Sequence, residues 1–181
     1  MTAIKLIDEN TGDFVTLDID EETNALVVMG EPHAILHQGK MYTVSMFDED
    51  VADNGYLTLQ VATGTKEVHI GGVVDAGGDA VVSLTEGAST TGGTPLNIYN
   101  KNRNSANTSE ATVVSNPTIT VSGTVLYEEF IIGGVYNQAV GANTRTNGEW
   151  ELAPNTKYLF RAQNRAGLAK VISVSLEFYE I

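Results

Sequence analysis

Apolar and polar residues alternate along much of this chain with a period of two, which is the pattern of half-buried β-strands. The clearest case is the stretch 171–181, in which one face carries Ile172, Val174, Leu176 and Phe178. Serine, glutamate and tyrosine side chains fill the alternate positions of this stretch. The same alternation predicts strands over residues 56–62, 66–70, 80–85 and 118–123. The chain is therefore predicted to consist mainly of strands.

Turn-forming residues separate the predicted strands. The stretches between them are rich in Gly, Asn, Asp and Pro, which favour turns through positive φ angles or local hydrogen bonds. No amphipathic helix is evident, and residues 31–40 are interpreted as a loop that enters a strand. Roughly ten strands at spacings of about 8–15 residues predict an all-β fold. We expect an antiparallel β-sandwich, of which a jelly roll is one form.

The first 32 residues differ from the rest of the chain. They contain eight acidic residues and one basic residue, with apolar pieces too short to form a core of their own. Two interpretations stay open, since terminal segments are ordered only where something holds them. Residues 1–32 form edge strands of the main sandwich, or they form an arm that reaches a neighbouring subunit. Residues 33–181 are predicted to form the β-sandwich domain.

Charge and composition exclude several classes of function. The net charge is −13, and all of the excess lies in residues 1–100, which hold 16 acidic and three basic residues. Such a body should be repelled by nucleic acid, whose binding proteins neutralise phosphates with clustered Lys and Arg. No run approaches the roughly 18 apolar residues of a membrane span. The absence of cysteine excludes a disulfide framework and a Cys-based zinc site.

Two clusters of potential metal ligands lack a known pattern. Residues 48–55 gather four carboxylates before Asn54 and Gly55, but they do not follow the spacing of a calcium-binding loop. We interpret them as a solvated hairpin turn. His33 and His37 are four residues apart, but no Glu lies between them, as a zinc protease motif would require. No metal site is therefore expected.

Catalytic patterns are also missing. The chain has no G-x-S-x-G nucleophile motif and no phosphate-binding loop of the Walker type. Glu128 and Glu129 are adjacent, so in a strand they would point to opposite faces and could not flank one glycosidic bond. We expect no catalytic residues, no cofactor and no enzymatic activity.

Two Asn-Arg pairs are the remaining candidates for a functional role. Asn102 and Arg103 follow the alternation of residues 96–98, and Asn164 and Arg165 follow that of residues 158–162. Each pair therefore lies where a predicted strand ends. Arg offers five donors that bind carboxylates or carbonyls in pairs. Either these loops brace their own sandwich, or they lie together at one end of it and contact another subunit. We name the four residues as candidates for a partner interface.

Several segments resemble small proteins that tailed bacteriophages encode with their head genes. They are "EPHAILHQGKMYTVS" (31–45), "GTPLNIYNKNRN" (93–104), "WELAPNTKYLFRAQNR" (150–165) and "VSLEFYEI" (174–181). The similarity in order and spacing covers residues 31–181. It implies a structural protein of the virion, a head decoration or cement protein made in the bacterial cytoplasm.

The resemblance also implies partners and a location. Decoration proteins of this kind often form trimers on the outside of the capsid, at junctions between hexamers, so the expected partners are the major capsid protein and further copies of the chain. An acidic body favours the exterior, away from packaged DNA. A tail protein, or a receptor-binding or carbohydrate-binding module, is the alternative. That module needs exposed aromatic rings, whereas Trp150 alternates with Leu152 and should point inward.

Overall fold

The computed structural model describes residues 6–7, 14–15, 31–133, 142–145 and 149–181. The chain divides into two compact units, Met1–Ala34 and Ile35–Ile181. In the first unit, β1 (Leu6–Ile7) pairs antiparallel with β2 (Phe14–Val15).

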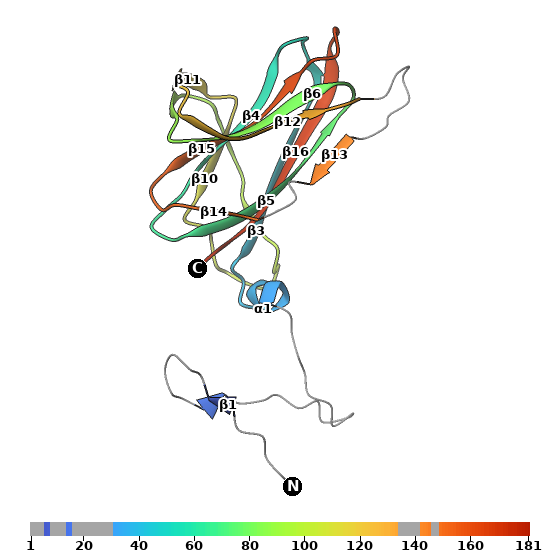
Figure 1. The fold of residues 1–181 in the computed structure, drawn as a ribbon. Helices are drawn as coiled ribbons and strands as arrows, with labels where there is room; N and C mark the ends of the chain where they lie inside the picture. Colours follow the sequence, from blue (N-terminus) through green and yellow to red (C-terminus); the bar gives the residue numbers. More distant parts are fainter. Residues whose placement is uncertain (1–5, 8–13, 16–30, 134–141, 146–148) are drawn as a thin grey trace, which may run out of the picture. The chain divides into compact units, whose positions relative to one another are not determined.

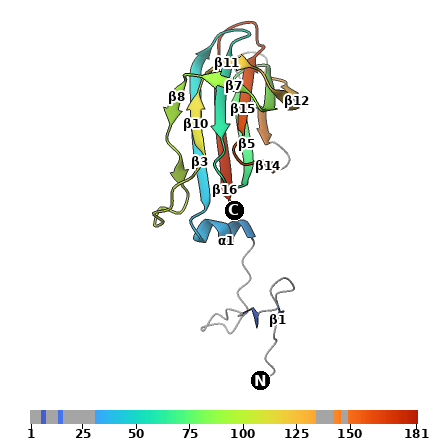
Figure 2. The ribbon, with the colours of Figure 1, turned by 90° about the vertical axis from the view of Figure 1, so that its left-hand side faces the viewer.

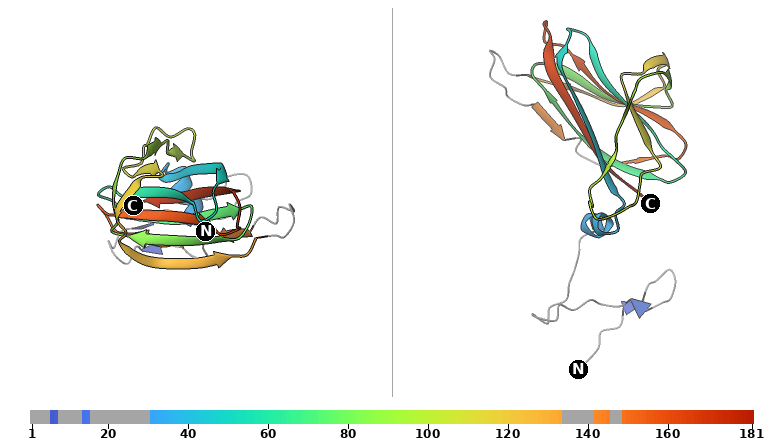
Figure 3. Two further views of the ribbon diagram at one scale, coloured as in Figure 1. Left: turned by 90° about the horizontal axis from the view of Figure 1, so that it is seen from above. Right: turned by 180° about the vertical axis from the view of Figure 1, so that it is seen from behind.

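The second unit contains two large antiparallel sheets that pack face to face (Figures 1 and 3). The first sheet has the order β12-β6-β15-β4-β10-β8. Its strands are β12 (Thr124–Ile131), β6 (Ala80–Glu86), β15 (Lys157–Asn164), β4 (Tyr56–Ala62), β10 (Thr112–Ser115) and β8 (Thr94–Leu96). The second has the order β13-β5-β16-β3-β9, and β14 also pairs with β5. Its strands are β13 (Ala142–Arg145), β14 (Trp150–Leu152), β5 (Val68–Ala76), β16 (Lys170–Glu180), β3 (Met41–Val51) and β9 (Tyr99–Asn100). The predicted all-β sandwich is confirmed.

Consecutive long strands alternate between the two sheets. The chain passes from β3 in the second sheet to β4 in the first, and then to β5 in the second and β6 in the first. The strands β15 and β16 again lie in different sheets, with β15 between β6 and β4 and β16 between β5 and β3. The connection after each of β3, β4, β5 and β15 therefore crosses from one layer of the sandwich to the other.

The core lies between the sheets and follows the predicted alternation. In β4, Leu57, Leu59 and Val61 are fully buried, and in β16 the four apolar residues of the predicted inward face are at most 1% exposed. Phe178 packs against Tyr42 across neighbouring strands, with ring centroids 5.6 Å apart. Burying one apolar side chain of this size stabilises the fold by about 1.5–3 kcal/mol.

A small third layer lies on the outward side of the first sheet. It consists of β7 (Ser89–Thr91) paired with β11 (Thr118–Val121), and Figure 2 shows both strands beside the sandwich. The Thr90 hydroxyl donates to the side-chain oxygen of Gln60, a residue on the outward face of β4. The turn-rich stretch after β6 therefore contains β7 and the beginning of β8. Val121 stays exposed because β11 pairs with β7 and not with a core strand.

Residues 31–40, expected to be a loop, begin with a short helix, α1 (Glu31–His37). Pro32 suits the first turn of a helix, where a backbone N–H has no helical partner. Gly39 has a φ of 67° and ends the helix, because its N–H donates to the Leu36 carbonyl at 3.0 Å. In the described residues, no helix is long and apolar enough to cross a membrane.

A buried tyrosine provides a test of this packing. The Tyr158 hydroxyl donates to a carboxylate oxygen of Glu86 at 2.8 Å and accepts the Ala153 N–H at 2.9 Å. Burial and the bond to Glu86 raise the pKa of Tyr158 to about 12. Between about pH 10 and pH 12 the unfolded tyrosine ionises while the folded one stays neutral, so this stabilisation is lost as pH rises through that range.

We predict that Tyr158→Phe lowers the free energy of unfolding by about 1–3 kcal/mol at neutral pH, because two polar groups lose their partner. The variant should also lose less stability than the wild type between about pH 10 and pH 12. Thermal midpoints across this range measure both effects. If the wild type and the variant lost equal stability as the pH rose, the Tyr158 hydroxyl would not be the group whose ionisation destabilises the fold.

Candidate functional site

Asn164, the last residue of β15, is buried and connects separate segments of its own domain through hydrogen bonds. It is 1% exposed, and its side-chain nitrogen donates to the carbonyls of Val51 at 2.7 Å and Leu168 at 2.8 Å. Its side-chain oxygen accepts the Ala166 N–H at 3.0 Å. These bonds tie the loop after β15 to the end of β3.

Arg165 is exposed beside Asn164. Its guanidinium donates to the side-chain oxygen of Asn54 at 3.0 Å, and its backbone N–H donates to the Asp79 carbonyl at 2.8 Å. Asn54 lies in the turn between β3 and β4, with a φ of 59°. Arg165 therefore connects turns of its own sandwich while its side chain remains open to solvent.

The other pair lies in the loop that follows β9. The Asn102 side chain donates to the His37 carbonyl at 3.1 Å and accepts the Asn104 N–H at 3.1 Å. Arg103 is exposed, and among the described residues its guanidinium donates only to the Asn100 carbonyl, at 3.5 Å. Its guanidinium also lies 5.9 Å from the Tyr99 ring. Arg103 is thus held less firmly than Arg165.

The two Asn-Arg pairs lie at opposite ends of the sandwich. The Lys101 N–H donates to the carbonyl of Met41, where β3 begins, whereas Asn164 binds the carbonyl of Val51, where β3 ends. The strand between them has 11 residues and spans roughly 33 Å. Of the two alternatives, the one in which both loops lie together at one end of the sandwich is therefore wrong. One partner surface at a single end of the sandwich would not reach both pairs.

A buried glutamate organises the end of the sandwich at which β3 begins. The Glu180 side chain is 2% exposed and accepts the Ser109 hydroxyl at 2.6 Å, the Glu110 N–H at 3.0 Å and the Ala111 N–H at 3.0 Å. Its second oxygen lies 3.9 Å from the ammonium of Lys66. The carboxylate thus fixes the segment 109–111 against β16.

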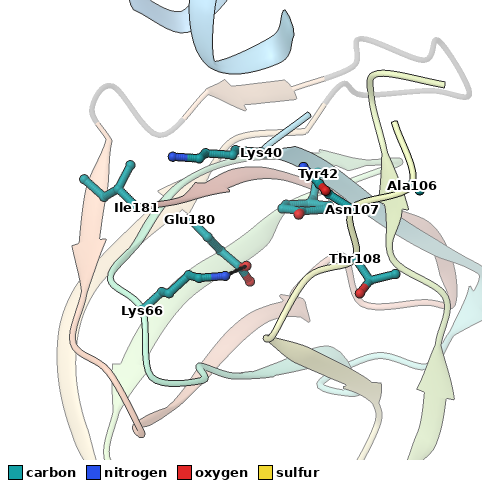
Figure 4. Close-up of a pocket in the computed structure, with 8 residues that line it drawn as sticks. All are labelled: Lys40, Tyr42, Lys66, Ala106, Asn107, Thr108, Glu180 and Ile181. Carbon is teal, nitrogen blue, oxygen red and sulfur yellow. Dashed lines mark ion pairs between the residues drawn. The ribbon is translucent and has the colours of Figure 1, made fainter. Parts of the chain in front are cut away.

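A cavity of about 480 Å³ opens next to this carboxylate. Its polar lining includes Lys40, Tyr42, Lys66, Asn107, Thr108 and Glu180 (Figure 4). In Figure 4 the side chains of Lys40 and Lys66 lie on either side of Glu180, and Tyr42 lies beside Asn107. We call this cavity the lysine pocket.

An apolar cavity of about 420 Å³ lies next to the lysine pocket. The two cavities share Tyr42, Asn107 and Thr108 in their walls. The apolar cavity is otherwise lined largely by β8, β10 and the residues that follow β8, among them Leu96 and Ile98. The segment 107–108 therefore separates a polar recess from an apolar one.

The electrostatics of the lysine pocket reflect these contacts. The Lys66 ammonium lies 2.7 Å from a Glu110 carboxylate oxygen, and this bond raises the pKa of Lys66 and lowers that of Glu110. Burial raises the pKa of Tyr42, and the negative charge of Glu180 raises it further. Because both shifts are upward, the Tyr42 hydroxyl is protonated and the Lys66 ammonium is charged at neutral pH.

The remaining sequence candidates are placed as follows. Asp48 and Asp50 belong to β3, and only Asp53 lies in the turn, where it accepts the Gly167 N–H at 2.9 Å. His33 and His37 lie one turn apart on α1 and are exposed. Among the residues that the structure describes, no group of three or more His, Asp or Glu side chains is placed to hold a metal ion.

Trp150 is partly buried and packs against the core, as expected from its alternation with Leu152. Its ring meets Tyr127 edge-on, with centroids 6.5 Å apart. Trp150 therefore does not provide an open aromatic platform.

The sequence contained one signal for Glu180. It continues the inward series of β16, two positions after Phe178, so a carboxylate stands where the pattern calls for an apolar residue. A charge at such a position needs partners. Lys40 and Lys66 carried no comparable signal, although they are two of the three basic residues in positions 1–100.

The chain matches no protein-family model, no curated protein and no solved structure.

The contrast between the two asparagines gives a prediction about folding. Asn164→Ala removes three buried bonds and should lower the free energy of unfolding by about 2–3 kcal/mol. Asn102→Ala removes hydrogen bonds near the surface and should lower the free energy of unfolding by less than about 1 kcal/mol. Denaturant unfolding of both variants measures the difference. If both variants lost the same free energy of unfolding, the burial of Asn164 would not be what makes its hydrogen bonds important for stability.

Proposed function

We propose that this protein is a non-enzymatic virion structural protein, a decoration or cement protein that binds the outside of a bacteriophage capsid as a homo-oligomer, such as a trimer. Its mode of action is mechanical. A protein that bridges neighbouring capsid subunits and binds only the assembled shell stabilises that shell by mass action. The supporting arguments are the resemblance of residues 31–181, the order of the strands, the distribution of charge and an exposed apolar surface.

The strand order supports a jelly roll as the form of the sandwich. A jelly roll wraps pairs of strands around two sheets, so that consecutive strands alternate between layers. The passages from β3 to β6 and from β15 to β16 have this character. Viral capsid proteins and lectins both use this architecture, so the fold alone does not choose between the proposal and a carbohydrate-binding module.

The observation that carries the proposal is the exposed apolar surface at the edge strand β12. Four large apolar residues in and next to this strand are 38–76% exposed: Val125, Leu126, Phe130 and Ile132. Val125 and Phe130 pair with Thr85 and Val81, which lie on one face of β6, so these two side chains share that face, whereas Leu126 lies at a bulge. Exposed apolar side chains that share a face mark an interaction site more often than single exposed residues do. We name these four residues the β12 surface.

The other edge of the same sheet differs. The strand β8 has three residues, and one of them is Pro95, which has no N–H to offer a further strand. The strand β12 has eight residues and pairs on one side only, with β6, among the described strands. The sheet is thus closed to additional pairing at β8, and β12 is the edge suited to a partner.

The charge supports a location on the exterior. The net charge of −13 disfavours contact with packaged DNA, and a shell partner would have to present neutral or basic surface. Glu128 and Glu129 stand at the centre of β12, so two copies of this strand paired antiparallel about its centre would bring like charges together. The β12 surface therefore suits the capsid better than a second copy.

The alternative is a tail or receptor-binding module that recognises a carbohydrate. Such a module would need aromatic rings exposed together, and the single Trp is partly buried against Tyr127. A specific hit on a glycan array would favour this alternative over the proposal.

The proposal is tested with purified protein and with capsids that lack it. We expect an oligomer in solution and saturable binding to the capsids, because a stable contact of this kind buries more than about 1,000 Å². Phe130→Ser should weaken capsid binding at least tenfold while shifting the free energy of unfolding by less than about 0.5 kcal/mol. Phe47→Ser is the matched control, since Phe47 is 64% exposed on β3 of the other sheet. Absence of both oligomers and capsid binding would refute the proposal.

The exposed arginines give a separate prediction. If the loops contact a partner, Arg103→Ala and Arg165→Ala should weaken association more than they weaken folding. Because the pairs lie at opposite ends of β3, we expect each variant to affect a different contact. Oligomer mass, capsid binding and thermal midpoint are measured for each variant. Lower thermal midpoints with unchanged association would instead assign these residues to bracing within the domain.

A further inference from the structure

We propose that the outward face of the first sheet takes part in capsid binding through Arg161, which pairs with a carboxylate of the shell protein. The inference rests on the proposed function and extends the β12 surface across the neighbouring strands β6, β15 and β4. Three observations carry it: the missing acceptor of the Arg161 guanidinium, the position of Arg161 on the open face, and the order of charges along that face.

The first observation concerns the hydrogen bonds of Arg161. The structure describes the side chains of three arginines, and Arg161 is the least exposed of them. Arg103 and Arg165 each donate to an acceptor, at 3.5 Å and 3.0 Å, whereas Arg161 forms no hydrogen bond and no ion pair with a described residue. In the described part of the chain, its Nε is the one buried side-chain nitrogen or oxygen without a partner. A guanidinium has donors only, so the partner it lacks is an acceptor.

The guanidinium of Arg161 is held in place by an aromatic ring. Its central carbon lies 3.9 Å from the centre of the Tyr56 ring. Stacking of this kind fixes the plane of the guanidinium before a partner arrives. The two terminal nitrogens also lack a described partner but are not buried, so a carboxylate outside the chain can reach them. Arginine and tyrosine are enriched among the residues that dominate the binding energy of protein interfaces.

The second observation is that Arg161 lies on the same open face as Phe130 of the β12 surface. Arg161 and Gln163 alternate with the buried core residues of β15, so both point outward. The register places Gln163 beside Val81 of β6, and Val81 beside Phe130 of β12. On its other side, Gln163 pairs with Tyr56 of β4. One row of outward residues thus crosses four strands, and the rings at its two ends are 44% and 54% exposed.

The third observation is the order of charges in the next row of the same face. Arg161 pairs with Ser83 of β6, and Ser83 pairs with Glu128 of β12. Glu128 is exposed and forms no ion pair with a described residue. The strands that carry the two charges are separated by β6 and lie roughly 10 Å apart. The face therefore presents an unpaired positive charge and an unpaired negative charge in a fixed order.

These features define the chemistry of the partner. A shell surface that is neutral or basic overall fits the net charge of −13, and within it a carboxylate opposite Arg161 and a basic group opposite Glu128 would pair both charges. A carboxylate suits Arg161 better than a backbone carbonyl, because it also supplies the missing counter-charge. A sheet face with exposed rings at both ends of a row suits a protein surface, whereas small ligands bind in cavities.

The test compares Arg161→Gln with the wild type in binding to capsids that lack the protein. Glutamine keeps hydrogen-bond donors and removes the charge. We expect binding to weaken about tenfold or more, because a charge-assisted pair is lost. The affinity of the wild type should also fall more steeply with salt than that of the variant, since salt screens the pair.

Lys101→Gln is the matched control. It removes one positive charge next to β9 of the other sheet, where Lys101 is already paired with Glu177 at 2.8 Å, and should change capsid binding by less than about twofold. Equal weakening by Lys101→Gln and Arg161→Gln would show that binding follows the net charge and would overturn the inference.

Thermal unfolding separates a role in binding from a structural one. Because Arg161 bonds no described residue, Arg161→Gln should shift the thermal midpoint by less than about 4 °C. A larger fall would show that the chain itself holds the guanidinium, and the inference would be wrong. This measurement needs no capsid.

The remaining outcomes separate this inference from the proposed function. If the wild type does not bind capsids, the proposed function fails and the inference fails with it. If the wild type binds and Phe130→Ser weakens binding but Arg161→Gln does not, only the inference is overturned. Weaker binding of Arg161→Gln with an unchanged dependence on salt would replace the carboxylate with a neutral acceptor and would also contradict the inference.

Discussion

The pairing of β16 with β3 on one side and β5 on the other is the constraint on which the rest of the structure depends. The strand has 11 residues, and its register fixes which side chains enter the core. A shift by one residue would turn Phe178 and its apolar neighbours to the solvent and bring serines inside. The same register places Glu180 at the inward end of the series, where it fixes the segment 109–111. Core packing and the shape of the lysine pocket therefore depend on one alignment.

Strand alternation predicted much of the fold, because half-buried strands leave a direct signal in the sequence. The predicted segment 56–62 has the bounds of β4, and the predicted inward residues of β16 are buried. The helix α1 was missed because its seven residues are too few to show a helical period. The strands β7 and β8 were missed because they are short and consist mostly of threonine, serine and proline, in a segment that also contains paired glycines.

The candidate site was predicted only in part. The position of Asn102 and Asn164 at strand ends could be inferred from local alternation. The burial of Asn164 and the hydrogen bonds of both side chains could not, since they depend on residues such as Val51 and His37 that are distant in sequence. The placement of the two pairs at opposite ends of β3 is likewise a property of the topology. Lys40 and Lys66 meet at one pocket because β16 brings Glu180 between them, and no sequence spacing encodes that arrangement.

The β12 surface and the lysine pocket are two separate features with different chemistry. One is an exposed apolar edge of the first sheet, and the other is a polar recess at the end of the sandwich where β3 begins.

Imaging of intact phage particles with and without this protein tests the central claim most directly. The account predicts that the particles containing the protein show additional density on the outer surface of the capsid, into which the sandwich fits with β12 facing the shell. Density at the tail, density on the inner surface of the capsid, or no difference between the two kinds of particle would contradict it.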